Sequence, residues 1–533
     1  MAPQADLRPL EPHAVKAMLG DGEEIAIVDL REELIYSQNH LLFARSVPLS
    51  RLELKFARLV PRRGTRIVLC DDDDGLAARA AAILAQAGYT NLFYLAGGVP
   101  AWSKAGLELF SGVHVPSKAF GEFIEHASET PSVSAEELEQ LMRSGTDMVV
   151  LDSRPFDEYH RMSIPTGVDV PGAELVLRIR DIAPSPDTLV VVNCAGRTRS
   201  IIGAQSLINA GVPNKVVALR NGTMGWNLAG LTCEHGQERR APTVSDQSLA
   251  WAKSAAAQVA RRFGVERIDA ATLERWRAER ETRTLYVLDV RDPPEYEAGH
   301  VAGALPAPGG QLVQATDLYV GTLGARIVLV DDREVRAVMT ASWLRQMGWK
   351  DVYVLVAQGT ETGQPKIDVL GAPPSAELSI TCAALAALIA RDAVTVVDLS
   401  SSRDYLRAHI PGSFFAIRSR LAAALGKIKP RGTLVLTSED GVLAALAASE
   451  ASAQADVPVR ALAGGNASWQ AARHPMTADG AKMADDAIDT WLKPYERSRD
   501  IPAAMREYLA WEIDLLARIA RDGTTDFARF QPM

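Results

Sequence analysis

A short apolar strand that ends in aspartate recurs four times along this chain of 533 residues. The aspartates stand 123, 137 and 109 residues apart, and the segments are Ile25–Asp29, Met148–Asp152, Leu285–Asp289 and Val394–Asp398. Such repetition indicates that one structural unit is used several times. Within each repeat, short strands alternate with helical patterns, which predicts an α/β fold with a parallel sheet flanked by helices. Right-handed crossovers bring the loops after the strands to one edge of such a sheet, where its sites lie.

The repeats define four tandem α/β units. We place them at residues 1–111, 131–236, 265–372 and 373–478, and call them units 1 to 4. A tryptophan closes units 1, 2 and 4, whereas unit 3 lacks it; the three are Trp102, Trp226 and Trp469. A chain of this length is too long for a single hydrophobic core, so division into several domains is expected.

Three segments lie outside the units. Residues 112–130 have the Pro, Gly and Ser content of a loop, and we expect a packed connector between the units, although their aromatic and basic side chains could line a pocket of unit 2. Residues 237–264 contain an Ala-rich helical pattern capped by Ser245 or Asp246. The tail, residues 479–533, is predicted to be helical and to pack on a neighbouring unit or a second chain, so a homodimer stays open. Its predicted apolar stripe consists of Met505, Leu509, Ile513, Leu516 and Ala520, widened by Trp511 and Leu515.

Composition excludes several functional classes. The net charge is −9 and there is no Lys/Arg tract, so no nucleic-acid partner is expected. There is no apolar stretch long enough for a membrane span and no signal-peptide pattern at the start. The four cysteines are far apart without a Cys-x-x-Cys pair, which argues against a disulfide framework, a zinc site or any other metal; they are Cys70, Cys194, Cys233 and Cys382. We therefore expect a soluble cytoplasmic protein without a cofactor.

Cys194 has the surroundings of a reactive thiol. It ends an apolar strand pattern and precedes a short loop with a glycine and two arginines, after which a helical pattern runs to Gly211. A loop that curls around the sulfur directs backbone N–H groups toward it, and the next helix adds the positive end of its dipole. These features favour the thiolate, which is the nucleophilic form of cysteine.

The loop from Cys194 to Arg199 resembles the active-site loop of the rhodanese sulfurtransferases, in which a cysteine opens a six-residue loop and carries sulfur as a persulfide. Leu151–Tyr159 is similar to the Asp-x-Arg…Glu-Tyr element of that family, and Leu219–Trp226 to its glycine-pair and tryptophan ending. The related phosphatase fold uses a loop one residue longer. The loop length therefore disfavours a cysteine phosphatase or an arsenate reductase, a choice that an assay with 4-nitrophenyl phosphate would decide.

The resemblance implies a set of site residues, with Cys194 as the catalytic nucleophile. The implied substrate-binding groups are the loop residues Ala195, Gly196, Arg197, Thr198, Arg199 and Ser200, together with Arg154. The loop N–H groups would stabilise thiolate and persulfide, and the two loop arginines would bind an anionic donor unless one turns outward to a carboxylate. Arg154 is a plausible further anion contact, although the Asp-x-Arg pair more often braces the fold in this family. Ser163 stands where the family usually has a histidine. We interpret that histidine as structural.

The other three units are expected to be inactive copies. In unit 3, Asp331 stands opposite Cys194, and the corresponding loop of unit 4 also lacks a cysteine. In unit 1, counting back from the glycine pair aligns Cys70 with Cys194, whereas counting back from the helix-ending glycine aligns Asp71, which we favour. Four consecutive aspartates there would raise a thiol pKa and repel anionic donors. Cys233 could resolve a persulfide, but an ordinary thiol is the favoured reading.

The sequence thus predicts a repeat-built transferase, a sulfurtransferase of the rhodanese type with one competent site. In this hypothesis, Cys194 takes sulfane sulfur from a small donor such as thiosulfate and passes it from a persulfide to cyanide or a thiol. One alternative is a sulfur carrier that delivers to a partner protein or to glutathione, with the inactive units as docking surfaces. Another is a noncatalytic scaffold.

Overall fold

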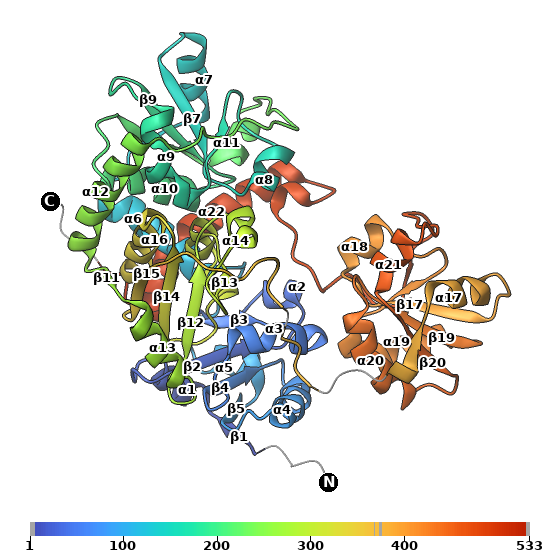
Figure 1. The fold of residues 1–533 in the computed structure, drawn as a ribbon. Helices are drawn as coiled ribbons and strands as arrows, with labels where there is room; N and C mark the ends of the chain where they lie inside the picture. The colour runs from blue at the N-terminus through green and yellow to red at the C-terminus, as the bar shows by residue number, and fades with distance from the viewer. Residues whose placement is uncertain (1–5, 367, 372–375, 529–533) are drawn as a thin grey trace.

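The computed structural model describes residues 6–366, 368–371 and 376–528. It contains four parallel sheets, one in each unit, as the repeats predict (Figure 1). Units 1 to 3 lie against one another, and unit 4 stands to one side (Figure 1). The strand order is the same in all four sheets, with one added strand in unit 4.

The strands are short, and the central ones are almost wholly apolar because both faces of each sheet are covered by helices. In sheet order, those of unit 1 are β1 (Leu7–Leu10), β5 (Leu92–Leu95), β4 (Arg66–Cys70), β2 (Ile25–Asp29) and β3 (Ala44–Ser46). Those of unit 2 are β6 (Ser132–Val133), β10 (Val216–Leu219), β9 (Leu189–Asn193), β7 (Met148–Asp152) and β8 (Val168–Asp169). Those of unit 3 are β11 (Glu266–Arg267), β15 (Val352–Val356), β14 (Arg326–Asp331), β12 (Leu285–Asp289) and β13 (Leu305–Pro306). Those of unit 4 are β16 (Ser379–Ile380), β20 (Val459–Leu462), β19 (Thr433–Thr437), β17 (Val394–Asp398), β18 (Phe414–Phe415) and β21 (Lys482–Met483).

Helices connect the strands in the same order in each unit. Unit 1 has α1 (Pro12–Met18), α2 (Glu33–Tyr36), α3 (Leu52–Leu59), α4 (Leu76–Gln86) and α5 (Gly98–Lys104). Unit 2 has α7 (Ala135–Arg143), α8 (Phe156–Arg161), α9 (Leu175–Ile182), α10 (Thr198–Asn209) and α11 (Gly222–Leu228). Unit 3 has α13 (Ala270–Ala278), α14 (Pro293–Ala298), α15 (Gly309–Gln314) and α16 (Val335–Gln346), and among the described residues from 357 to 371 no helix follows its last strand. Unit 4 has α17 (Cys382–Ile389), α18 (Ser402–Arg407), α19 (Leu421–Ile428), α20 (Val442–Ser452) and α21 (Gly465–Ala471).

The first connecting segment differs from its prediction. Instead of a loop, residues Val115–Ser128 form helix α6, with Pro116 in its first turn, where a proline costs no hydrogen bond. Gly121 in mid-helix allows close contact, because a Cβ there would lie 2.8 Å from Thr198 Cγ2. The expectation of a loop is therefore wrong, whereas the expected packing is present: α6 is a helix that packs directly on α10 of unit 2.

The second connector and the tail are helical, as predicted. Helix α12 (Asp246–Phe263) is capped by the Ser245 hydroxyl, which accepts a hydrogen bond from the Ser248 N–H. The tail contains α22 (Ile501–Asp522), which packs along α6 of the same chain (Figure 1). Its predicted apolar stripe is only partly right, because Ile513 is 52% exposed while Glu512 is buried.

Units 2 and 3 share one continuous hydrophobic core. It includes buried residues of α10 and α16, with Trp343 of unit 3 donating a hydrogen bond to Ser206 Oγ of unit 2 at 2.8 Å. Unit 4 has separate cores of its own. The predicted structural role of the repeated histidine is confirmed: in units 1, 3 and 4 it stacks on the tyrosine four residues earlier, as His300 does on Tyr296 with ring centroids 3.9 Å apart. In unit 2, Ser163 takes this place and keeps the same backbone bridge.

Candidate active site

Cys194 lies between the end of β9 and the start of α10, as predicted, and is only 2% exposed. Its Sγ atom is 3.4 Å from Ser200 Oγ. Its carbonyl oxygen accepts a hydrogen bond from the Thr223 N–H at 2.9 Å. Gly222 makes this approach possible, since it has a φ of +53° and a Cβ there would stand 2.2 Å from the Cys194 oxygen. Gly222 of the Leu219–Trp226 motif thus lets the start of α11 pack against the loop.

The other three units show what this loop is shaped to hold. In each, the residue at the Cys194 position turns its own side-chain oxygen into the loop, where a backbone N–H donates to it. The donor–acceptor distances are 2.9 Å for Ala77 N to Asp71 Oδ2, 2.9 Å for Arg336 N to Asp331 Oδ2 and 3.2 Å for Ala444 N to Ser438 Oγ. In unit 2 the residue at this position is a cysteine. The loop is therefore a cradle of inward-pointing N–H groups, which holds a carboxylate in units 1 and 3 and a hydroxyl in unit 4, and only unit 2 offers it sulfur.

Strand register decides which residue of unit 1 corresponds to Cys194. Cys70 pairs with Asp29 in the way that Asn193 pairs with Asp152. Asp71 is therefore the equivalent of Cys194, as the helix-based count predicts. Cys70 is buried in the unit 1 core, and burial, followed by the charge of Asp29, raises the pKa of its thiol well above the usual value.

The two loop arginines are both paired with carboxylates. Arg197 donates from Nε and Nη2 to the two oxygens of Glu122 at 2.7 Å each, and Nη2 also contacts Glu125; both acids belong to α6. Burial raises the pKa of Glu122, with Arg197 opposing the shift. Arg199 contacts Glu158 at 2.9 Å and Gln311 at 3.0 Å. We predicted that one of the two loop arginines could pair with a carboxylate instead of binding the donor. In the structure, both Arg197 and Arg199 pair with carboxylates.

Arg154 braces the fold. It is 1% exposed and donates to both oxygens of Asp152, at 2.8 and 2.6 Å. The same pair recurs as Arg31 with Asp29 and Arg291 with Asp289, in units that have no cysteine at the loop. Because units with and without a loop cysteine share this interaction, it supports the bracing role over an anion contact.

A cavity of about 510 Å³ opens above Cys194 and is lined by all four units. The predicted loop residues Ala195, Gly196, Arg197, Thr198 and Arg199 line it, and Ser200 lies beneath at the sulfur. Residues that the sequence did not single out come from α2, α6, α15, α18 and the tail; they include Glu33, Lys118, Gln311, Arg403, Lys493 and Tyr508. No spacing in the sequence connects these positions, because each lies in a different part of the chain.

A buried ion pair between α6 and α22 supports the far side of the loop. Lys118 Nζ lies 2.9 Å from Glu512 Oε1, and the Tyr508 hydroxyl donates to the same oxygen at 3.2 Å. Glu512 is fully buried, and its other oxygen would lie 3.1 Å from a Cβ placed on Gly196. The tail thus contacts the loop that carries Cys194.

Cys233 lies away from the cavity. It packs in the unit 2 core with Ile164 and Trp226, and its Sγ donates to Asn227 Oδ1 at 3.4 Å. Burial raises the pKa of its thiol to about 11. These surroundings support the reading of an ordinary thiol.

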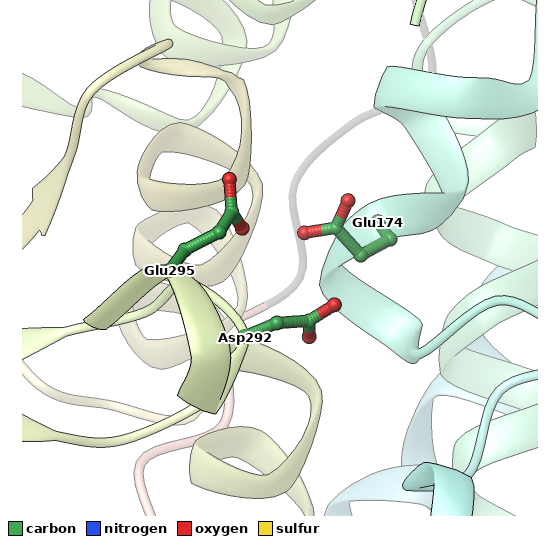
Figure 2. Close-up of side chains that lie close together, drawn as sticks. All are labelled: Glu174, Asp292 and Glu295. Atoms are coloured by element: carbon green, nitrogen blue, oxygen red, sulfur yellow. The ribbon is translucent and has the colours of Figure 1, made fainter. Parts of the chain in front are cut away.

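Three carboxylates meet at the contact of units 2 and 3, as Figure 2 shows: Glu174, Asp292 and Glu295. The guanidinium of Arg336 supplies countercharge, with Nη1 at 2.8 Å from Glu174 Oε1 and 2.5 Å from Glu295 Oε2. Burial, followed by the charge of Glu174, raises the pKa of Asp292 to about 6. The group forms an inter-unit ion-pair network.

Among the described residues, no helix combines the length and the apolar character needed to cross a membrane.

The rhodanese-like domain model matches this chain four times, at residues 11–105, 134–229, 269–358 and 381–472. The chain belongs to the rhodanese family. A crystal structure of a thiosulfate sulfurtransferase from Pseudomonas aeruginosa is similar to this rhodanese over 98% of this chain and 100% of that chain, with 46% identity and a TM-score of 0.95. A curated thiosulfate sulfurtransferase from Pseudomonas aeruginosa PAO1 is 27% identical over 230 residues, which cover 36% of this chain and 83% of that protein.

Proposed function

We propose that this rhodanese transfers sulfane sulfur from thiosulfate to a thiophilic acceptor, cyanide or a thiol, through a persulfide on Cys194. The chain is an enzyme of the rhodanese type, by its family and by its match to a thiosulfate sulfurtransferase along nearly its whole length. The observation that carries the proposal is that Cys194 occupies the cradle of N–H groups that the other three units fill with their own side-chain oxygens.

The reaction is a double displacement. The Cys194 thiolate attacks the outer sulfur of thiosulfate, the sulfur–sulfur bond of the donor breaks, and sulfite leaves with the electron pair. Backbone N–H groups of the loop and the first turn of α10 stabilise the anionic persulfide, as they stabilise carboxylates elsewhere in the chain. The acceptor then attacks the outer sulfur of the persulfide, and the Cys194 thiolate leaves. With cyanide the product is thiocyanate.

The surroundings of the loop favour a small donor. Cys194 is 2% exposed at the floor of a cavity, so the donor, like the acceptor, must enter that cavity to reach the sulfur. The four cysteines are free thiols, which supports a reducing compartment such as the cytoplasm as the place of action.

Intact mass after incubation with excess thiosulfate tests the proposal. The wild type is expected to gain the mass of one sulfur atom and to lose it on addition of cyanide. Cys194→Ser is expected to gain nothing, whereas the matched controls Cys70→Ser and Cys233→Ser behave as the wild type. No gain with thiosulfate or with organic persulfides would favour a noncatalytic scaffold instead. Robust hydrolysis of 4-nitrophenyl phosphate would overturn the assignment in favour of a phosphatase.

A further inference from the structure

The cavity above Cys194 has room for more than thiosulfate or cyanide. Its volume of about 510 Å³ falls within the range of roughly 300–1,000 Å³ that is typical of sites for whole organic ligands. Aromatic rings and amides line it beyond the loop: Trp491, Tyr495, Tyr508, Gln311 and Gln314. Amide side chains and tyrosines suit a ligand that has peptide groups of its own.

Two arginines from different units meet at the side of this cavity. Arg161 of α8 and Arg403 of α18 each donate to the same oxygen of Glu496, at 3.0 Å. Glu496 is 10% exposed, whereas the arginine side chains are 59% and 44% exposed. Two guanidinium groups against one carboxylate leave one positive charge in excess. Since a guanidinium has five N–H donors, the pair has donors left for a second carboxylate.

The two arginines of the Cys194 loop are less suited to binding a carboxylate of a ligand. Arg197 is held by two carboxylates of α6, and Arg199 shares Glu158 with Lys493, whose Nζ lies 3.0 Å from Oε1. The cavity is also lined by Asp157 and Glu33. Beside these acids, an organic ligand that carries an ammonium group as well as carboxylates finds a partner for each of its charges.

We infer that Arg161 and Arg403 form a carboxylate subsite for the far end of a low-molecular-weight peptide thiol, which accepts the sulfur from Cys194. This inference rests on the proposed function. The thiolate of the acceptor attacks the outer sulfur of the persulfide, the sulfur–sulfur bond to Cys194 breaks, and the Cys194 thiolate leaves with the electron pair. The acceptor departs as its persulfide. Unit 4, which has no cysteine at its own loop, then serves catalysis by supplying Arg403.

The experiment compares acceptors on the full-length protein charged with thiosulfate. The probes are glutathione, glutathione ethyl ester, which lacks one carboxylate charge, and cyanide. The variant is Arg403→Ala. Its control is Arg407→Ala on the same helix, because Arg407 pairs with Asp404 and is 75% exposed outside the cavity.

For Arg403→Ala, the ratio of kcat/KM with glutathione to kcat/KM with cyanide is expected to fall about tenfold, the effect of one charge-assisted hydrogen bond of roughly 1.4 kcal/mol. The fall in kcat/KM with glutathione should come mainly from a higher KM. The ester should already be a weaker acceptor for the wild type and lose little more in the variant, and Arg407→Ala should stay within twofold of wild type.

Equal losses with glutathione and its ester, or an equal effect of Arg407→Ala, would overturn the subsite. Turnover of cyanide without any transfer to glutathione would overturn the acceptor class while the proposed function stands. Absence of the Cys194 persulfide itself would overturn both.

Discussion

At the scale of single residues, Gly222 offers a direct test of how the cradle holds Cys194. A Cβ at this position would collide with the Cys194 carbonyl oxygen at 2.2 Å, and the φ of +53° disfavours any other residue. Gly222→Ala must therefore shift the loop. Because a displacement of about 1 Å can cost roughly a hundredfold in rate, we expect kcat/KM for thiocyanate formation to fall by about that factor.

The repeat provides the matched control, Gly98→Ala. Gly98 has a φ of +64°, and a Cβ there would stand 2.5 Å from the carbonyl oxygen of Asp71. Both variants should lose a similar free energy of unfolding, about 1–3 kcal/mol, but only Gly222→Ala should lose activity. Equal activity losses would show that the effect comes from general destabilisation.

A second residue-scale prediction concerns Asp169, at the end of β8. Burial, followed by the charge of Asp152, raises its pKa to about 7, and its Oδ1 atom has no hydrogen-bond partner. The native state therefore holds a proton that the unfolded state releases near pH 4, so stability declines as the pH rises from about 4 to 7. We expect Asp169→Asn to raise the free energy of unfolding at pH 8 by about 1–2 kcal/mol, with no gain at pH 4. Urea unfolding at the two pH values measures this, and an equal gain at both would contradict the assignment.

Among the residues of the site, sequence reasoning was most successful where one loop carries the chemistry. The Cys194 loop and the Leu219–Trp226 segment each match an element of the family's pattern, so both could be picked out from the sequence although 28 residues separate Cys194 from Gly222. The partners of the loop arginines could not, because Glu122 and Glu158 lie in segments whose distance from the loop is set by packing. A paired guanidinium and a free one look the same in a sequence.

At the scale of elements, the difficulty lay in α6. Pro116 and Gly121 indicate a loop when only local propensity is considered. In the structure, Pro116 occupies the first turn, and the glycine is needed for contact with Thr198. The error in the α22 stripe has a related cause, since the face that packs on α6 includes Glu512, whose charge is neutralised by Lys118. Apolar periodicity does not identify a buried ion pair.

This ion pair leads to a prediction about α22. Although burial opposes it, the Glu512 carboxylate raises the pKa of Lys118, so the buried lysine stays charged. Glu512→Ala leaves that buried ammonium group without its carboxylate and is expected to cost about 3–5 kcal/mol of unfolding free energy. The neighbouring Ile513→Ala, on the exposed face, should cost about 0.5 kcal/mol or less. Denaturant unfolding of both variants measures the difference.

The double variant Lys118→Met/Glu512→Leu separates charge from packing. Because it removes both charges together, it should recover most of the stability that Glu512→Ala loses. If the double variant is as unstable as Glu512→Ala, shape rather than charge makes the contact between α6 and α22 essential.

At the scale of the whole molecule, the sequence predicts four sheets but not how they are joined. The repeated strand fixes the fold of each unit, because a buried parallel strand has an apolar pattern of its own. The cavity above Cys194 depends on surfaces that differ between the copies, such as Gln311 of unit 3 and Arg403 of unit 4. Those surfaces carry no periodic signal. The part that units 1, 3 and 4 play in lining the cavity is therefore visible only in three dimensions.

The cores predict how the assembly unfolds. Units 2 and 3 share one core, whereas unit 4 has its own, so activity should depend on unit 3 as strongly as on unit 2 itself. Trp343 is 2% exposed in unit 3 and bonds to Ser206 of unit 2. Trp343→Ala is expected to cost about 3–5 kcal/mol and to lower the temperature at which thiocyanate formation is lost by about 10 °C.

The matched change in unit 4 is Leu434→Ala, at a fully buried position of its separate core, with an expected cost of about 2–5 kcal/mol. Scanning calorimetry should show it lowering a different transition, while the temperature of activity loss with cyanide changes little. If both variants instead lower one shared transition, the contacts of unit 4 with the rest, such as the ion pair of Arg418 with Glu53, couple it to the others as firmly as a common core. Either result measures how strongly the stability of unit 4 is coupled to that of the unit that carries Cys194.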